Sequence, residues 1–252
     1  VVSKDLTPDD LKCLKEITHK FSKRSKIMFL YENGSYDNAY IPKHMNYLSK
    51  ATYYKIMLPE LIQDIDKVIY IDSDTIILKD LIQMDDIVLG NNFLIGSLDF
   101  MNKAIIWKQK MSNYSLPLKK NEYVNAGVLI MNLKQMRHEN LSQKWIELAA
   151  KRLRYQEQDI LNSTCLGLIG FFNKKYNLMI IDKTKITTEV NIKAVRNVVI
   201  LHFAYPKPWV EKTALSDIWW KYAKMTKFYD KLIFNFFVNI KKRQNKTLFK
   251  PN

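Results

Sequence analysis

The segment Val68-Ile69-Tyr70-Ile71-Asp72-Ser73-Asp74 is an apolar run that ends in two carboxylates. A continuous run of β-branched and aromatic residues predicts a buried β-strand, here over residues 67–71. Side chains two apart in an extended chain point the same way, so we expect Asp72 and Asp74 to face one point beyond the strand's carboxyl end, where open α/β sheets bind ligands. The pair predicts a divalent-metal site, because two close carboxylates repel each other without a cation or proton between them. The alternative is a pair of aspartates that caps the next turn.

The rest of the chain alternates strand-like apolar runs with helical patterns. Strands are predicted at residues 27–30, 67–71, 93–97, 128–131 and 198–201, and helices at 51–58, 141–153 and 158–166. A further helix is expected after Thr7, which is a good cap, with Pro8 at the first helical position. This alternation predicts an α/β fold with a mostly parallel sheet that helices cover on both faces.

Composition narrows the class of protein. The chain has 252 residues, enough for one large domain or two small ones, and its 47% of apolar residues excludes general disorder. Two cysteines cannot form a disulfide framework, so a reducing, cytosolic compartment is expected. Residues 221–252 hold nine Lys or Arg and one Asp, and thus +8 of the net charge of +15. We therefore divide the chain into a domain at 1–220 and a basic, aromatic C-terminal tail at 221–252.

Two more apolar runs are joined to polar residues that can bind a ligand. Val199-Ile200-Leu201-His202 ends in an imidazole, which together with carboxylates suits Mn²⁺ better than Ca²⁺. Taken alone, His202 is also compatible with a hydrogen-bonded core histidine. Asn125-Ala126-Gly127 precedes the run at 128–131, where Asn125 could hydrogen-bond a ligand hydroxyl, although the same residues are ordinary in turns.

Two loop or helix-start segments complete the set of candidates. Most side chains of Tyr155-Gln156-Glu157-Gln158-Asp159 are polar, and acidic residues are favoured at the positive end of a helix dipole. The same pattern also fits an ordinary solvent-exposed, capped helix start. Pro206-Lys207-Pro208-Trp209 is a rigid loop with a cation and a large ring, which could hold a diphosphate or pin the loop to the core.

In this order, the Asp-x-Asp, Asn-Ala-Gly, Gln-Asp, histidine and Lys-Pro-Trp segments resemble the retaining glycosyltransferases of family 8, from about Val1 to Trp209. That family includes bacterial lipopolysaccharide galactosyl- and glucosyltransferases. The resemblance implies a GT-A fold, which is a Rossmann-like mixed sheet with helices on both faces, at 1–220, and a basic helical tail. It also implies the transfer of galactose or glucose from a UDP-sugar to a glycan or lipid-linked saccharide acceptor, such as lipopolysaccharide or lipooligosaccharide.

The resemblance also implies roles for individual residues. Asp72, Asp74 and His202 would bind Mn²⁺, with Mg²⁺ as the alternative ion, and the metal would neutralise the departing diphosphate. The catalytic positions would be Gln158, which matches a glutamine near the reactive face of the sugar, and Asp159, which follows it. The donor-binding positions would be Lys55, Asp72, Ser73, Asp74, Asp99, Asn125, Ala126, Glu157, Gln158 and Lys207.

The sequence also departs from the family pattern. The family begins with a strand, a uridine-binding loop and a helix, about 40 residues that are missing before Val1, so we expect this chain to be inactive as given. Tyr205 stands where a glycine is usual in the loop that leads to Lys207, and this loop is one residue short. Glu157 replaces a common aspartate, and we expect its longer side chain to shift the sugar preference.

Two other functions fit parts of the sequence. A haloacid-dehalogenase-type phosphatase would use Asp72 as its nucleophile, but it needs a later acidic pair at a strand end, which is not found. A non-catalytic basic module would bind an anionic membrane through residues 221–252, since no nucleic-acid motif accompanies the charge. Joined to the family resemblance, the tail predicts a cytoplasmic enzyme that is peripheral on the inner face of the cytoplasmic membrane and binds no nucleic acid.

Overall fold

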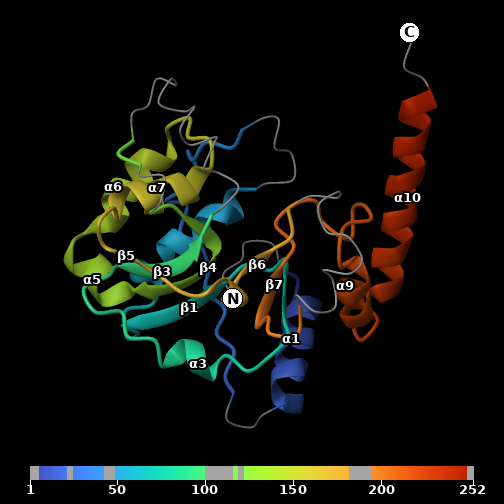
Figure 1. Cartoon of the computed structure of the whole chain (residues 1–252), viewed down its shortest axis with the longest axis horizontal. Helices are drawn as coiled ribbons and strands as arrows, with labels where there is room; N and C mark the ends of the chain where they lie inside the picture. The colour runs from blue at the N-terminus through green and yellow to red at the C-terminus, as the bar shows by residue number, and fades with distance from the viewer. Residues whose placement is uncertain are drawn as a thin grey trace.

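The computed structural model describes residues 6–21, 25–42, 49–99, 116–118, 122–181 and 195–248. Two sheets lie at the centre of the molecule, with helices packed around them (Figure 1). The elements, in chain order, are α1 (Pro8–Phe21), η1 (Lys50–Met57), α2 (Leu58–Leu61), β1 (Lys67–Ile71), β2 (Thr75–Ile77), α3 (Ile82–Asp85), β3 (Leu94–Leu98), β4 (Val124–Asn132), α5 (Leu133–His138), α6 (Leu141–Ala149), α7 (Gln156–Thr164), β5 (Ile169–Phe171), η3 (Lys174–Tyr176), β6 (Leu178–Met179), β7 (Ile200–His202), α9 (Ser216–Ala223) and α10 (Tyr229–Leu248).

Both sheets are mixed. The larger has the order β1-β4-β3-β5, in which β4 runs antiparallel to β1 and β3, while β3 and β5 are parallel. The smaller has the order β2-β7-β6, with β2 antiparallel and β6 parallel to β7. The expectation of a mostly parallel sheet is therefore wrong, because the long central strand β4 opposes both of its neighbours. The mixed sheet that the family resemblance implies is confirmed.

Helices cover both faces of the larger sheet. Successive residues of β4 point to opposite faces, as in any strand. Leu129 and Met131 enter one apolar cluster with Trp145 of α6, and Val128 and Ile130 enter another with Met84 of α3. All these side chains have no exposed surface. Strand β4 therefore has an apolar residue at each of these positions, because neither of its faces meets water.

Most predicted elements are present, with shifted ends. The strand at 67–71 is found as β1, and the cap is confirmed, because Asp10 N donates to Thr7 Oγ1 at 3.2 Å. The helix expected at 51–58 is the 3₁₀ helix η1, which continues as α2. The strand expected at 27–30 is wrong, since only Leu30 forms a bridge there.

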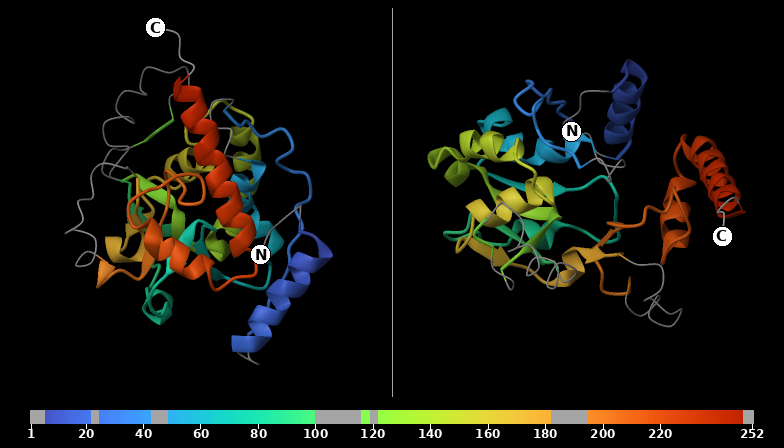
Figure 2. Two further views of the ribbon diagram at one scale, coloured as in Figure 1. Left: turned by 90° about the vertical axis from the view of Figure 1, so that its right-hand side faces the viewer. Right: turned by 90° about the horizontal axis from the view of Figure 1, so that it is seen from above.

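The C-terminal helices α9 and α10 lie at the opposite end of the molecule from α5 and α6 (Figures 1 and 2). Aromatic rings pack α9 against the preceding loop and against α10. The ring centroids of Trp219 and Trp209 are 5.2 Å apart, and those of Trp220 and Phe236 of α10 are also 5.2 Å apart. The predicted division after residue 220 falls inside α9. Among the described residues, no helix is both long and apolar enough to cross a membrane.

The core packing leads to a stability prediction. Leu129→Ala removes a fully buried side chain and leaves a cavity, so we expect it to lower the free energy of unfolding by about 2–5 kcal/mol. Val88→Ala is the control, because that side chain is 85% exposed and its loss should change stability by less than about 0.5 kcal/mol. Urea unfolding measures both, and equal losses would contradict the placement of Leu129 in the core.

Candidate functional site

The two aspartates of the Asp-x-Asp segment lie in the turn that joins β1 to β2, and this turn connects the two sheets. Asp72 N donates to Gly127 O at 2.7 Å, which extends the pairing of β1 with β4. Thr75 is paired with His202 in the smaller sheet, and Phe203 N donates to Asp74 O at 2.9 Å. The aspartates thus approach each other through a turn and not along the extended chain that the sequence suggested.

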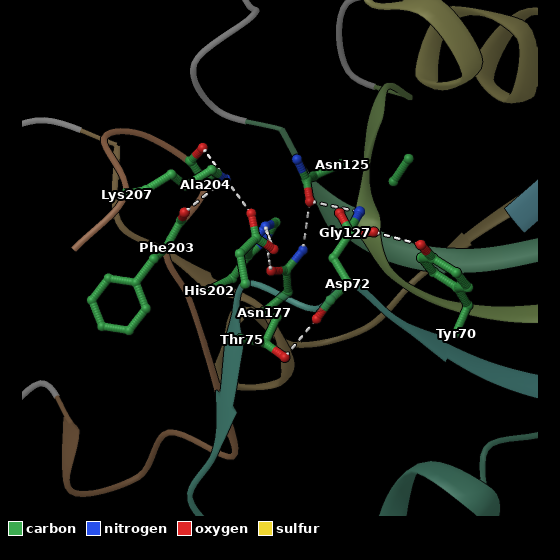
Figure 3. Close-up of polar contacts among 12 residues, drawn as sticks. Tyr70, Asp72, Thr75, Asn125, Gly127, Asn177, His202, Phe203, Ala204 and Lys207 are labelled. Atoms are coloured by element: carbon green, nitrogen blue, oxygen red, sulfur yellow. Dashed lines mark hydrogen bonds and ion pairs between the residues drawn. The ribbon is translucent and has the colours of Figure 1, made fainter. Parts of the chain in front are cut away.

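Asp72, Asp74 and His202 bring their ligand atoms within 4.8 Å of one another. Figure 3 shows Asp72 and His202 with the residues that hold them. Asp74 Oδ1 is buried, has no hydrogen-bond partner among the described residues, and lies 3.2 Å from His202 Nε2. A buried carboxylate oxygen without a hydrogen-bond donor is costly unless a cation compensates it. Two carboxylates and one imidazole form a donor set that suits a divalent cation such as Mn²⁺. The three residues therefore fit a metal ion.

Lys207 also lies at Asp74. Its ammonium contacts Asp74 Oδ2 and donates to Phe203 O at 3.0 Å and to Ala204 O at 2.8 Å. Burial raises the pKa of Asp74, but the adjacent imidazole of His202, followed by the charge of Lys207, outweighs burial and holds that pKa well below its usual range. Asp74 is therefore ionised and ready to bind a cation.

Lys55 of η1 holds the other aspartate. The 2% exposed side chain places its ammonium 3.2 Å from Asp72 Oδ1, 3.0 Å from Glu157 Oε1 and 3.0 Å from Ala126 O. Burial lowers the pKa of Lys55, but the nearby acidic groups, Asp72 foremost, outweigh burial and raise it well above its usual range. Tyr70 adds a hydrogen bond of 2.6 Å to Asp72 Oδ1. All three N–H groups of this lysine are thus engaged within the protein.

Gln158 occupies the middle of a buried set of amides. Its Oε1 accepts from Ala126 N at 2.9 Å and from Asn125 Nδ2 at 3.2 Å, while its Nε2 donates to Asp99 Oδ2 at 3.0 Å and to Tyr123 Oη at 3.2 Å. Both ends of the Gln158 amide are therefore fixed. The structure brings together Asp99, Asn125-Ala126 and Gln158, from three segments that the sequence singled out separately.

Asp159 lies one residue further along α7 and is held by other partners. Tyr123 Oη donates to its Oδ1 at 2.7 Å, and Tyr155 N donates to its Oδ2 at 2.9 Å. Burial raises the pKa of Asp159, although these hydrogen bonds partly oppose the shift. Ser73, between the two aspartates, is exposed at the tip of the turn.

Three residues of this network were not selected from the sequence. Tyr70 lies inside the segment 68–74, but an aromatic residue in an apolar strand is expected to pack in the core and does not by itself indicate a hydrogen bond. Tyr123 precedes β4, and Asn177 lies between η3 and β6, where no motif marks it. Asn177 Oδ1 is 2.9 Å from His202 Nδ1, and its Nδ2 donates to Asn125 Oδ1 at 2.9 Å. Spatial proximity alone identifies Asn177.

A mixed sheet with helices on both faces, an Asp-x-Asp turn at its edge and a histidine at the end of a later strand define a nucleotide-sugar transferase architecture, the GT-A fold. The Glycosyl transferase family 8 profile matches residues 1–213, and the chain belongs to this family.

Several proteins of known sequence or structure are similar to this chain. A putative glycosyltransferase of Haemophilus influenzae is 33% identical over 175 residues, which are 68% of this chain and 52% of that protein. A lipopolysaccharide 1,3-galactosyltransferase of Salmonella typhimurium is 25% identical over 63% of this chain and 49% of its own length. The crystal structure of galactosyltransferase LgtC with donor and acceptor sugar analogues superposes with a TM-score of 0.63, at 26% identity, over 80% of this chain and 76% of that one. The chain thus spans about half the length of these two sequence relatives.

The buried cluster around Lys55 leads to a second prediction. Lys55→Met leaves the buried Glu157 and the partly exposed Asp72 without their cation, and we expect a loss of about 3–5 kcal/mol of unfolding free energy. Adding Glu157→Gln removes one of the two uncompensated charges, so the double variant should recover part of that loss. Chemical denaturation of the two single variants and the double variant gives the coupling free energy between Lys55 and Glu157.

The matched control is Lys134→Met, which removes a surface lysine 3.8 Å from Asp66 in an exposed pair. It should change stability by less than about 1 kcal/mol. Strictly additive losses for Lys55 and Glu157 would show that the two do not form a buried pair.

Proposed function

We propose that this protein is a retaining hexosyltransferase that moves galactose or glucose from a UDP-sugar to a glycan acceptor, with lipopolysaccharide or lipooligosaccharide as the acceptor class. Membership of glycosyl transferase family 8 supports the reaction, and the similarity to a lipopolysaccharide galactosyltransferase supports the acceptor class. The single observation that carries the proposal is the convergence of Asp72, Asp74 and His202 at the edge of the sheets.

The metal ligands and Lys207 would act on the leaving group. A divalent cation, Mn²⁺ or Mg²⁺, supplies Lewis-acid neutralisation of the diphosphate when bound. Asp72, Asp74 and His202 would hold it. Lys207 is at Asp74 in this structure, so its ammonium is close to the place where a metal-bound diphosphate would lie. These residues would favour departure of the UDP.

The buried amides would act on the sugar. Asp99, Asn125 and Gln158 form one hydrogen-bonded group next to the metal ligands, and their polar atoms would orient the hexose hydroxyls. Gln158 would face the reacting carbon, and Asp159 would support it through Tyr123. We propose retention by attack of the acceptor hydroxyl on the face from which UDP leaves. The departing phosphate then takes the proton of the acceptor hydroxyl, and no covalent sugar–enzyme bond forms.

The donor proposal is tested by calorimetry on the protein expressed from its complete reading frame. We expect UDP-galactose or UDP-glucose to bind in the presence of Mn²⁺, and Asp74→Asn to weaken that binding by at least tenfold, because it removes a charged ligand of the cation. Asp85→Asn, at an exposed aspartate of α3, is the control and should bind normally. If the unaltered protein binds no UDP-sugar with Mn²⁺, the proposed function is wrong.

We also propose that α10 binds the anionic inner face of the cytoplasmic membrane, where a lipid-linked acceptor would lie. Phe234 and Phe237 are 68% and 62% exposed, and with Lys231 and Lys241 they share one face of α10 at helical spacing. Exposed aromatic residues between cations suit the boundary between headgroups and acyl chains. This helix would place the active site near its acceptor.

Vesicle sedimentation tests the membrane proposal. Binding should be strong to vesicles that contain phosphatidylserine, weaker to neutral ones, and several-fold weaker for the Phe234→Ser/Phe237→Ser variant, because that variant loses its apolar contact with the acyl chains. Val88→Ser, which alters an exposed apolar side chain away from α10, should bind as the unaltered protein does. Equal binding to neutral and anionic vesicles would exclude an electrostatic attachment.

A further inference from the structure

Asn177 contacts His202 but takes no direct part in the proposed chemistry. It lies at the end of η3, and its side chain is 1% exposed. Strand β6 begins at the next residue and runs parallel to β7, with Met179 paired with His202. The pairing of β6 with β7 therefore brings the amide of Asn177 to the imidazole, as Figure 3 shows.

The orientation of this amide is set by backbone donors. Gly127 N, which can only donate, binds Asn125 Oδ1 at 3.0 Å, so that atom must be an acceptor. The same oxygen accepts from Asn177 at 2.9 Å, which requires the NH₂ group of Asn177 to face Asn125. The oxygen of Asn177 then faces His202 Nδ1 at 2.9 Å. An oxygen there can only accept, so Nδ1 of His202 carries a hydrogen.

This arrangement leaves the other ring nitrogen ready to bind a metal. Because Nδ1 is bound to Asn177, Nε2 is the ring nitrogen that faces Asp74 Oδ1, at 3.2 Å, and a metal ion bound there would take the place of any hydrogen on Nε2. The ring lies against the backbone of Gly127, where a Cβ would come within 2.2 Å of its Cε1, so any residue other than glycine would displace it. Gly127 thus gives the imidazole room on one side, and Asn177 sets its direction through Nδ1.

The same amides continue to the proposed sugar site. Asn125 Nδ2 donates to Gln158 Oε1 at 3.2 Å, and Ala126 N fixes that oxygen as an acceptor in the same way. Gln158 Nε2 then donates to Asp99 Oδ2 at 3.0 Å. One directed series of hydrogen bonds therefore runs from His202 to Asp99, and Asn177 is the link between its metal and sugar ends.

We propose that Asn177 is a positioning residue that fixes the tautomer and the ring orientation of His202 and joins the metal ligands to the amides of the sugar site. This inference rests on the proposed function for the identity of the metal, but its structural part concerns the metal-free protein alone. The partners of metal-bound histidines typically affect metal affinity by 10–100-fold.

The first test reads the tautomer without metal or substrate. Long-range ¹H–¹⁵N NMR at about pH 8 distinguishes the two neutral imidazole tautomers, and the chain has only four histidines, of which His202→Gln assigns the relevant signal. We expect the hydrogen on Nδ1 in the unaltered protein. Asn177→Leu has a similar size and no acceptor, so the hydrogen should move to Nε2, where Asp74 Oδ1 can still accept it. Asn177→Asp keeps an acceptor and should retain the Nδ1–H form.

The second test measures Mn²⁺ affinity by electron paramagnetic resonance. Asn177→Leu should weaken binding by about 10–100-fold, and Asn177→Asp by much less. The control is Asn132→Leu, which removes an amide at the far end of β4 that binds Gln135 N and Asn92 O, and it should leave the tautomer and the affinity unchanged.

The outcomes separate this inference from the proposed function. An unchanged His202 tautomer in Asn177→Leu, or the Nε2–H form in the unaltered protein, would overturn the role of Asn177 even if Mn²⁺ binds. An unaltered protein that shows the expected tautomer but binds neither Mn²⁺ nor UDP-sugar would leave the positioning role supported and refute the proposed function.

Discussion

The turn Asp72-Ser73-Asp74 is the constraint on which the rest of the site depends, because it belongs to both sheets. A backbone hydrogen bond from Asp72 to Gly127 ties its beginning to the larger sheet, and one from Phe203 to Asp74 ties its end to the smaller. Two rigid hydrogen-bonded sheets therefore set the separation of the two carboxylates, and His202 follows from the pairing of β2 with β7. The metal ligands meet only if both sheets form.

The charges around this turn are costly to bury, and the fold compensates each of them with a fixed partner. Lys55 is shared by Asp72 and Glu157, and Lys207 neutralises Asp74. Such buried pairs rarely add much net stability, but they are strongly destabilising when one partner is lost. They hold the carboxylates in fixed positions, and a site that stabilises a developing negative charge requires such preorganisation.

The strongest local patterns predicted the elements correctly, and weak patterns did not. The run at 67–71 is found as β1 with the predicted ends, because its apolar side chains pack against clusters on both faces of the sheet. The strand is only partly buried and not fully as predicted, since it lies at the edge of the larger sheet. The short run at 27–30 is also apolar but forms only a bridge at Leu30, since no neighbouring strand pairs along its length in the described structure. Strand direction was not predictable from such runs, and β4 opposes both of its neighbours.

The sequence by itself determined the candidate residues of the site: the Asp-x-Asp pair, the late histidine and the polar start of α7 all stand beside apolar runs whose pattern indicates burial. Only the tertiary structure decided how they meet. It assigned Lys55 to Asp72, and it brought Asn177, which no pattern marks, to His202. Hydrophobic periodicity reports which side of an element is buried, whereas the direction of a buried hydrogen bond depends on groups that are distant in the chain and adjacent only after folding.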